Sequence, residues 1–202
     1  MAHTGRSGKR SQKPPGRVRI VAGKWRGRFL PVDDAAGLRP SSERIRETLF
    51  NWLAPVVEGA RCLDLFAGTG ALGLEALSRG AASATLVERS PKVAATLKRS
   101  IEMLGADGAV LHTGDAFSWL DREEPHPYDI VFLDPPYSLE SLADLCRLLQ
   151  EKQWLARGAS IYMEQDIHDC RPVLPDGFTV VREKSAGSVR YSLATTRDNN
   201  EV

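Results

Sequence analysis

The strongest constraint on the fold is an unbroken apolar run, Ile130–Leu133, which is followed by an acidic residue and two prolines. Consecutive β-branched, aromatic and aliphatic residues are typical of a strand buried on both faces, and such strands occur in parallel sheets. Because proline cannot donate to a strand ladder, we predict that this strand ends at Asp134 and that Pro135 and Pro136 form a stiff loop. The sequence therefore predicts an α/β fold with a mostly parallel sheet.

The loop Asp134–Tyr137 offers a carboxylate, backbone carbonyls and an aromatic ring within four residues. These groups suit a planar base with an exocyclic amine, because the amine can donate to the oxygens while the base stacks on the ring. The same four residues are also common in plain turns. From this loop alone, both interpretations stay open.

A second motif lies in Arg61–Gly73, where a predicted short buried strand leads through glycines into a helix. The spacing of Gly68, Gly70 and Gly73 is that of a dinucleotide-binding turn. However, Asp64 lies inside the preceding strand, where a carboxylate would repel a pyrophosphate and attract the ammonium of a methionine group. This favours S-adenosyl-L-methionine over NAD as the ligand.

Two further acidic residues follow predicted strands. Glu88 ends a strand predicted at 84–88, and an acidic residue about 20 positions after such a glycine turn accepts hydrogen bonds from ribose hydroxyls. NAD and S-adenosyl-L-methionine enzymes share this feature, so Glu88 does not choose between them. Asp115 follows a strand predicted at 110–113, where it would cap a short helix.

The remaining periodic segments predict helices at 38–57, 91–104 and 139–150, a strand at 159–164, and a terminal hairpin at 178–184 and 189–195. Right-handed crossovers would then give a seven-stranded sheet of order 3-2-1-4-5-7-6 with an antiparallel C-terminal hairpin. In this order the first and fourth strands are neighbours. The glycine turn and the Asp134 loop would therefore open onto one crevice.

The helix predicted at 38–57 would begin after Pro40, with Ser41 or Ser42 as its cap. Its apolar positions recur at helical spacing and comprise Ile45, Leu49, Trp52, Leu53 and Val56. The opposite, solvent-facing side would carry Arg44, Arg46 and Glu47.

Charge is segregated along the chain although the formal net charge is only +1. Residues 1–50 hold 12 Lys and Arg against 4 Asp and Glu, whereas the rest holds 15 against 22. We predict a disordered basic tail at 1–17, an N-terminal hairpin and helix at 18–57 and the main domain at 58–197. Lys24, Arg26 and Arg28 would share one face of that hairpin, and such basic charge favours a polyanion partner.

Three segments of this chain resemble known enzymes. D-P-P-Y after a buried strand resembles the signature of amino-methyltransferases, and D-L-F-A-G-T-G resembles the S-adenosyl-L-methionine turn of methyltransferases. The segment G-L-R-P-S-S-E-R-I-R-E-T-L-F-N-W-L is similar to the N-terminal signature of the RsmD-type family, bacterial methyltransferases of guanine N2 in small-subunit ribosomal RNA. The resemblance extends from about Arg19 to Thr195.

The resemblance implies a class I fold and methylation of the exocyclic N2 amine of a specific guanine in 16S rRNA, with S-adenosyl-L-methionine as the cofactor. It implies 16S rRNA or the assembling small subunit as partner, no metal and no membrane. We further expect a cytoplasmic protein, because no apolar run reaches the length of a membrane span. We also expect a monomer.

The resemblance also implies roles for individual residues. The catalytic residues would be Asp134, Pro135, Pro136 and Tyr137. The cofactor-binding residues would be Asp64, Phe66, Ala67, Gly68, Gly70, Glu88, Arg89, Asp115 and Ala116. In this resemblance Asp115 binds the adenine amino group, which is the alternative to its role as a helix cap. The RNA-binding residues would be Lys24, Arg26, Arg28, Arg39, Ser41, Arg44 and Arg46.

Three other functions compete with this interpretation. A DNA adenine-N6 or cytosine-N4 methyltransferase shares the Asp-Pro-Pro-Tyr chemistry, but this chain has no length for a separate target-recognition domain. An NAD-dependent oxidoreductase is disfavoured by Asp64 and by the lack of an evident hydride-transfer residue. A non-catalytic RNA-binding module would leave the cofactor residues without a role.

Overall fold

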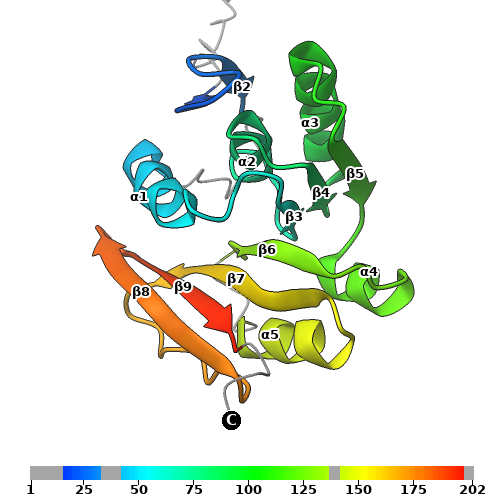
Figure 1. Cartoon of the computed structure of the whole chain (residues 1–202). Coiled ribbons are helices and arrows are strands. Elements are labelled where there is room, and N and C mark those ends of the chain that lie inside the picture. The colour runs from blue at the N-terminus through cyan, green and yellow to red at the C-terminus, as the bar shows by residue number, and fades with distance from the viewer. Residues whose placement is uncertain (1–15, 33–41, 137–141, 198–202) are drawn as a thin grey trace, which may run out of the picture.

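The computed structural model describes residues 16–32, 42–136 and 142–197 (Figure 1). The N-terminal part contains β1 (Arg17–Arg19), β2 (Phe29–Pro31) and α1 (Glu43–Leu53). The central part contains β3 (Arg61–Asp64), α2 (Gly73–Ser78), β4 (Ser83–Glu88), α3 (Pro91–Leu104), β5 (Ala109–Thr113) and α4 (Ala116–Arg122). The C-terminal part contains β6 (Tyr128–Leu133), α5 (Leu142–Glu151), β7 (Leu155–Asp166), β8 (Phe178–Ala186) and β9 (Val189–Thr196).

The main sheet has seven strands in the order β5-β4-β3-β6-β7-β9-β8. The strands from β5 to β7 pair in parallel, whereas β9 pairs antiparallel with both β7 and β8. The predicted strand order is thus confirmed. Asp64 of β3 lies opposite Phe132 of β6, so the carboxyl ends of these two strands meet at one edge of the sheet.

Helices cover both faces of the sheet (Figure 1). One core lies on the side of α1, α2 and α3, and it includes Leu49, Leu74 and Phe132. The other lies on the side of α4 and α5, and it includes Leu120 and Val131. Adjacent β6 residues enter opposite cores because side chains alternate along a strand, which explains why the whole run Ile130–Leu133 is apolar.

Helix ends follow the local signals in the sequence. The Ser42 hydroxyl accepts a hydrogen bond from the Ile45 amide at 3.3 Å, and Ser90 caps α3 in the same way. Pro91 opens α3, and Gly105 ends it with a φ of 59°. Among the helices of the described ranges, none combines the length and apolar character that crossing a membrane requires.

Several predicted boundaries were wrong. The helix expected at 38–57 ends at Leu53, because Pro55 has no amide hydrogen with which to continue the helical hydrogen bonding. Val56 is consequently 48% exposed rather than part of the apolar stripe, and residues 38–41 lie outside the described residues. The strand expected at 159–164 is longer, since β7 spans Leu155–Asp166.

The N-terminal hairpin packs on α2. β1 and β2 pair antiparallel as predicted, and the Trp25 ring is buried. The Lys24 amide donates to the Ser78 carbonyl at 2.7 Å, and the Trp25 amide donates to the Ser78 hydroxyl at 2.9 Å. The hairpin is therefore attached to the helix that follows the glycine turn.

The solvent-facing position predicted for Arg46 was wrong. Its side chain is 2% exposed and lies beside the fully buried Glu75 of α2, with 3.6 Å between Nη1 and Oε2. Another guanidinium nitrogen of Arg46 donates to the Arg19 carbonyl at 2.9 Å. Periodicity could not reveal this placement, because α2 covers the side of α1 that a solitary amphipathic helix would leave in water.

Candidate active site

The candidate cofactor site begins at the carboxyl ends of β3 and β4. In open sheets, ligands bind at the carboxyl ends of the strands, at the point where the strand order reverses. In this sheet β3 and β4 lie on one side of that point and β6 lies on the other. Glu88, the last residue of β4, accepts hydrogen bonds from the Gly68 amide at 2.9 Å and the Ser90 amide at 2.7 Å. These bonds fix the Glu88 carboxylate against the glycine turn.

Two glycines of the motif lie where an added Cβ would meet a neighbouring leucine side chain. Gly70 has a φ of +79°, and a Cβ there would come within 2.5 Å of the Leu97 side chain. A Cβ on Gly73 would come within 2.3 Å of the Leu86 side chain. These positions bring α2 close to the sheet and to α3, so the cofactor-binding role predicted for Gly70 stays a prediction.

Asp64 is the clearest polar residue for a ligand to meet. Its side chain is 1% exposed, and Oδ2 accepts a hydrogen bond from the Gly73 amide at 3.1 Å. Oδ1 is buried and makes no hydrogen bond within ordinary geometric limits. Burial raises the pKa of Asp64 to about 7, against the opposing effect of the Gly73 and Phe66 backbone. A ligand ammonium would supply the missing partner, so this residue suits the methionine end of S-adenosyl-L-methionine.

Replacing Asp64 with asparagine should weaken S-adenosyl-L-methionine binding about 10- to 100-fold, the usual range for a lost charged hydrogen bond. Since the free carboxyl has a pKa near 7, wild-type affinity should rise from pH 6 to pH 8 as it ionises. Titration calorimetry of wild type and variant across this range checks both effects. The variant retains the titration of the ligand amine, so an equal pH dependence in both proteins would contradict a role for Asp64.

The same raised pKa has a consequence for the stability of the ligand-free protein. Between the unfolded pKa of about 4 and the folded pKa of about 7, the native state binds the proton that the unfolded state has lost. The contribution of Asp64 to folding stability should therefore fall as pH rises through this window. Urea unfolding of wild type and Asp64→Asn at pH 4.5 and 7.5 measures the difference, and a fall of equal size in both proteins would contradict it.

The other predicted cofactor residues lie around this edge. Phe66 is half-buried, Ala67 and Ala116 are buried, and Arg89 is exposed. Asp115 caps α4, since its Oδ1 accepts a hydrogen bond from the Ser118 amide at 3.1 Å. The structure thus contains the helix cap that the sequence predicted for Asp115. A contact with adenine remains a prediction.

The candidate catalytic loop leaves the sheet beside this site. Asp134 follows β6 directly and is half-buried, whereas Pro135 is buried and Pro136 is exposed. The Leu65 amide, just beyond β3, donates to the Phe132 carbonyl at 3.3 Å. This bond holds the start of the glycine segment next to the end of β6. Tyr137 lies outside the described residues.

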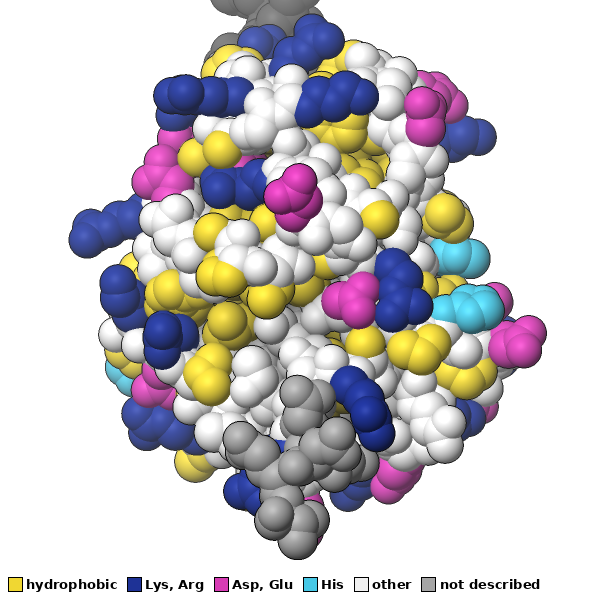
Figure 2. Space-filling model, in the orientation of Figure 1, with side chains coloured by type: hydrophobic (Ala, Val, Ile, Leu, Met, Phe, Trp, Pro, Cys, Tyr) yellow, Lys and Arg dark blue, Asp and Glu magenta, His cyan; other side chains and the backbone are white. Residues whose placement is uncertain are grey.

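The predicted RNA-binding residues separate into two groups. Lys24, Arg26, Arg28 and Arg44 are exposed, and Figure 2 shows Lys and Arg side chains gathered over the N-terminal hairpin at the top of the view. Arg46 is buried beside Glu75, as described above. Arg39 and Ser41 lie outside the described residues.

Sequence reasoning assigned no role to Glu164, which is 2% exposed near the carboxyl end of β7. The sequence does contain a signal for this residue, because its carboxylate directly follows the apolar run Ile161–Met163. Such a residue does not belong in a buried strand unless the structure or a ligand uses its charge.

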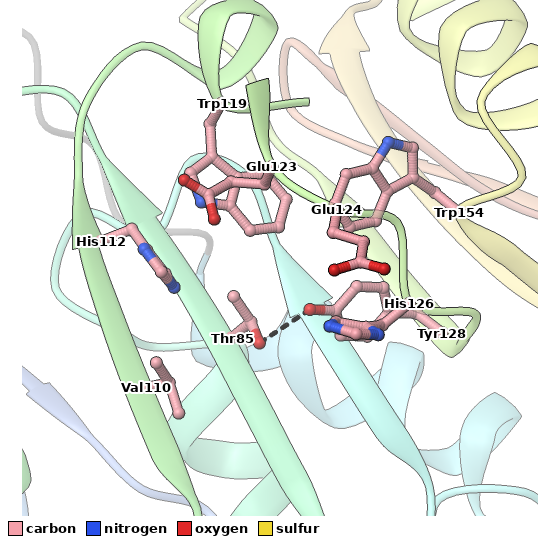
Figure 3. Close-up of a pocket in the computed structure, with 9 residues that line it drawn as sticks. All are labelled: Thr85, Val110, His112, Trp119, Glu123, Glu124, His126, Tyr128 and Trp154. Atoms are coloured by element: carbon pink, nitrogen blue, oxygen red, sulfur yellow. Dashed lines mark hydrogen bonds between the residues drawn. The ribbon is translucent and has the colours of Figure 1, made fainter. Parts of the chain in front are cut away.

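A separate cavity of about 400 Å³ opens on the α4 side of the sheet (Figure 3). Its residues are Thr85, Val110, His112, Trp119, Glu123, Glu124, His126, Tyr128 and Trp154. Inside it, the Tyr128 hydroxyl bonds to the Thr85 hydroxyl at 2.9 Å. Tyr128 begins β6, at the strand end opposite Asp134, so this cavity is separate from the candidate active site.

The sheet order, the glycine turn with Asp64 and the acidic corner after β6 together define a class I methyltransferase fold. A solved RNA methyltransferase from Salinibacter ruber in complex with S-adenosyl-L-homocysteine has this fold, with a TM-score of 0.58 at 15% identity over 81% of this chain and 96% of that chain.

Comparison with more similar proteins identifies the family. The family described as Conserved hypothetical protein 95 matches residues 18–195. Ribosomal RNA small subunit methyltransferase D from Escherichia coli is 48% identical over 178 residues, which are 88% of this chain and 89% of that protein. A solved Escherichia coli structure, provisionally assigned as methyltransferase yhhF, has a TM-score of 0.85 at 45% identity and covers 91% of this chain and 100% of its own. The chain belongs to this family of small-subunit ribosomal RNA methyltransferases.

Proposed function

We propose that this protein transfers a methyl group from S-adenosyl-L-methionine to the N2 amine of a specific guanine in 16S rRNA. The observation that carries the proposal is the position of Asp134, half-buried at the end of β6 and next to the strand that bears Asp64. Membership of the family supports the ribosomal substrate. We also propose that the enzyme acts as a monomer in the cytoplasm, where small subunits assemble.

The chemical problem is that the exocyclic amine of guanine is a poor nucleophile, because its lone pair is delocalised into the ring. The Asp134 carboxylate and the Pro135 carbonyl would accept the two N–H bonds and so orient the lone pair. S-adenosyl-L-methionine supplies an electrophilic methyl group. As positive charge develops on the amine nitrogen, the Asp134 carboxylate would stabilise it and could take the released proton.

Positioning accounts for most of the expected rate enhancement. Holding two reactants in line is worth about 7 to 11 kcal/mol, and a carboxylate aimed at the developing charge adds a few kcal/mol. Asp134 therefore does not need to be a strong base. A target base in an RNA loop would also be unstacked at a lower cost than one in a helix.

The exposed basic side chains would bind the RNA backbone. We expect the double variant Lys24→Ala/Arg26→Ala to weaken rRNA binding and to reduce the slope of log affinity against log salt by about 0.7 to 0.9 for each phosphate that the variant no longer neutralises. Binding titrations at several salt concentrations measure the slope. A matched control is Arg122→Ala/Arg157→Ala, which removes two exposed cations outside the N-terminal segment. Equal slopes in the two double variants would contradict the assignment.

The substrate is tested by incubating the protein and labelled S-adenosyl-L-methionine with 16S rRNA, assembled small subunits or DNA. Label should enter guanine N2 of the rRNA or of the subunit, as nucleoside analysis after digestion would show. Label in adenine or cytosine of DNA would instead support the alternative amino-methyltransferase. Activity on subunits but not on free rRNA would identify the assembled particle as the substrate.

A further inference from the structure

A second carboxylate lies beside the proposed catalytic one. Leu133 of β6 pairs with Met163 of β7, so the next residues along the two parallel strands are Asp134 and Glu164. Glu164 is 2% exposed, and its other strand neighbour is Tyr191 of β9. The mechanism described above makes no use of Glu164.

Both carboxylates belong to the same face of the sheet. Phe132 and Tyr162 are members of the core on the α1 side, and Asp134 and Glu164 follow them by two residues, which is one full strand repeat. The pKa of Tyr162 is raised, first by burial and then by the Glu164 and Asp134 carboxylates. The two carboxylates are thus close enough to act on one hydroxyl.

Two neighbouring carboxylates at this edge of the sheet offer acceptor oxygens side by side. Such a pair of acceptors suits a ligand that presents adjacent N–H donors. Guanine presents such donors on its Watson–Crick edge, where N1–H lies next to the N2 amine. Adenine and cytosine instead present an unprotonated ring nitrogen beside their amine, which a carboxylate would repel.

We propose that Glu164 accepts the N1–H of the target guanine while Asp134 holds its N2 amine, so that Glu164 determines the choice of base. This inference rests on the proposed function and extends it to the basis of specificity. A site built to pair with a ring N–H strongly disfavours an analogue that lacks this donor, because a buried polar group is then left without its partner.

The test uses small subunits reconstituted with 16S rRNA that carries either guanine or 2-aminopurine at the methylated position. 2-Aminopurine keeps the amine at C2 but has an unprotonated N1. Wild type should methylate the guanine substrate with a kcat/KM at least 100-fold higher. Comparable rates on the two substrates would overturn the role of Glu164 without affecting the proposed function, whereas failure to methylate guanine would refute the proposed function itself.

The variant Glu164→Gln should lower kcat/KM for guanine about 10- to 100-fold and leave the 2-aminopurine rate unchanged or higher, since its amide can donate to N1. The thermal midpoint and S-adenosyl-L-methionine affinity should match those of wild type. An equal loss on both substrates would indicate a structural role and overturn the proposal. The control Tyr162→Phe removes the neighbouring hydroxyl and should preserve the preference for guanine. Loss of that preference in Tyr162→Phe would also overturn the proposal.

Discussion

Replacing Asp134 with alanine should reduce the rate of methyl transfer about 10²- to 10⁴-fold while S-adenosyl-L-methionine affinity changes little. The variant loses the carboxylate that orients the amine and stabilises its developing charge. It keeps Asp64 and Glu88, which lie on β3 and β4 and are held by the Gly73, Gly68 and Ser90 amides. Single-turnover kinetics with saturating substrate measures the chemical step, and calorimetry measures cofactor binding.

Two further variants make this test specific. Asp134→Asn keeps an oxygen that can accept an N–H bond but removes the negative charge, so it should retain more activity than alanine. Asp121→Asn is a matched control, because Asp121 is exposed on α4 and pairs with Lys152 away from the carboxyl-end edge. Normal turnover by Asp134→Ala, or an equal loss in Asp121→Asn, would refute the catalytic role.

Replacing Glu75 with alanine should destabilise the protein by about 3 to 5 kcal/mol, the usual cost of removing one partner from a buried ion pair. Glu75 is fully buried and has partners from three segments. Its carboxylate lies 2.8 Å from Arg79 Nε and 3.6 Å from Arg46 Nη1. It also accepts hydrogen bonds from the Val21 and Ala22 amides, at 2.7 and 3.0 Å.

Urea denaturation measures the loss, and Glu102→Ala is the control because Glu102 is an exposed glutamate on α3. Hydrogen exchange gives a local readout, since the Val21 and Ala22 amides should lose protection when their acceptor is removed. A change in unfolding free energy as small as that of the control would contradict the assignment. Unchanged protection of both amides would contradict the local effect.

The Glu75 contacts connect the proposed RNA-binding segment to the cofactor site. The hairpin that carries Lys24 and Arg26 is held by Glu75 and Ser78 of α2, and α2 is the helix that follows the glycine turn. A displaced hairpin should therefore weaken RNA binding without removing any basic residue. The Glu75→Ala variant can be tested for this effect in the same salt titration.

Much of the fold could be predicted from local sequence signals. The run Ile130–Leu133 indicated a strand buried on both faces, and Ser90, Pro91 and Gly105 marked the two ends of α3. The alternation of strands and helices, with an antiparallel hairpin at the end, led to the observed strand order. Each of these signals acts within one element or follows from the right-handedness of crossovers.

The positions of buried polar residues could not be predicted in this way. Arg46 was placed in water by its helix period, yet it pairs with Glu75, which is 29 positions away in the chain. The position of Glu164 next to Asp134 follows from the β6–β7 register, which no local signal in the sequence specifies.

The sequence by itself determined the elements, their order and the motif residues, because these depend on backbone preferences and on the apolar periodicity of each segment. The tertiary structure alone decided which charged side chains are buried and which partners they meet. Periodicity identifies the faces of a helix or strand but not the element that covers each face, and the protonation and pairing of a carboxylate depend on that covering element.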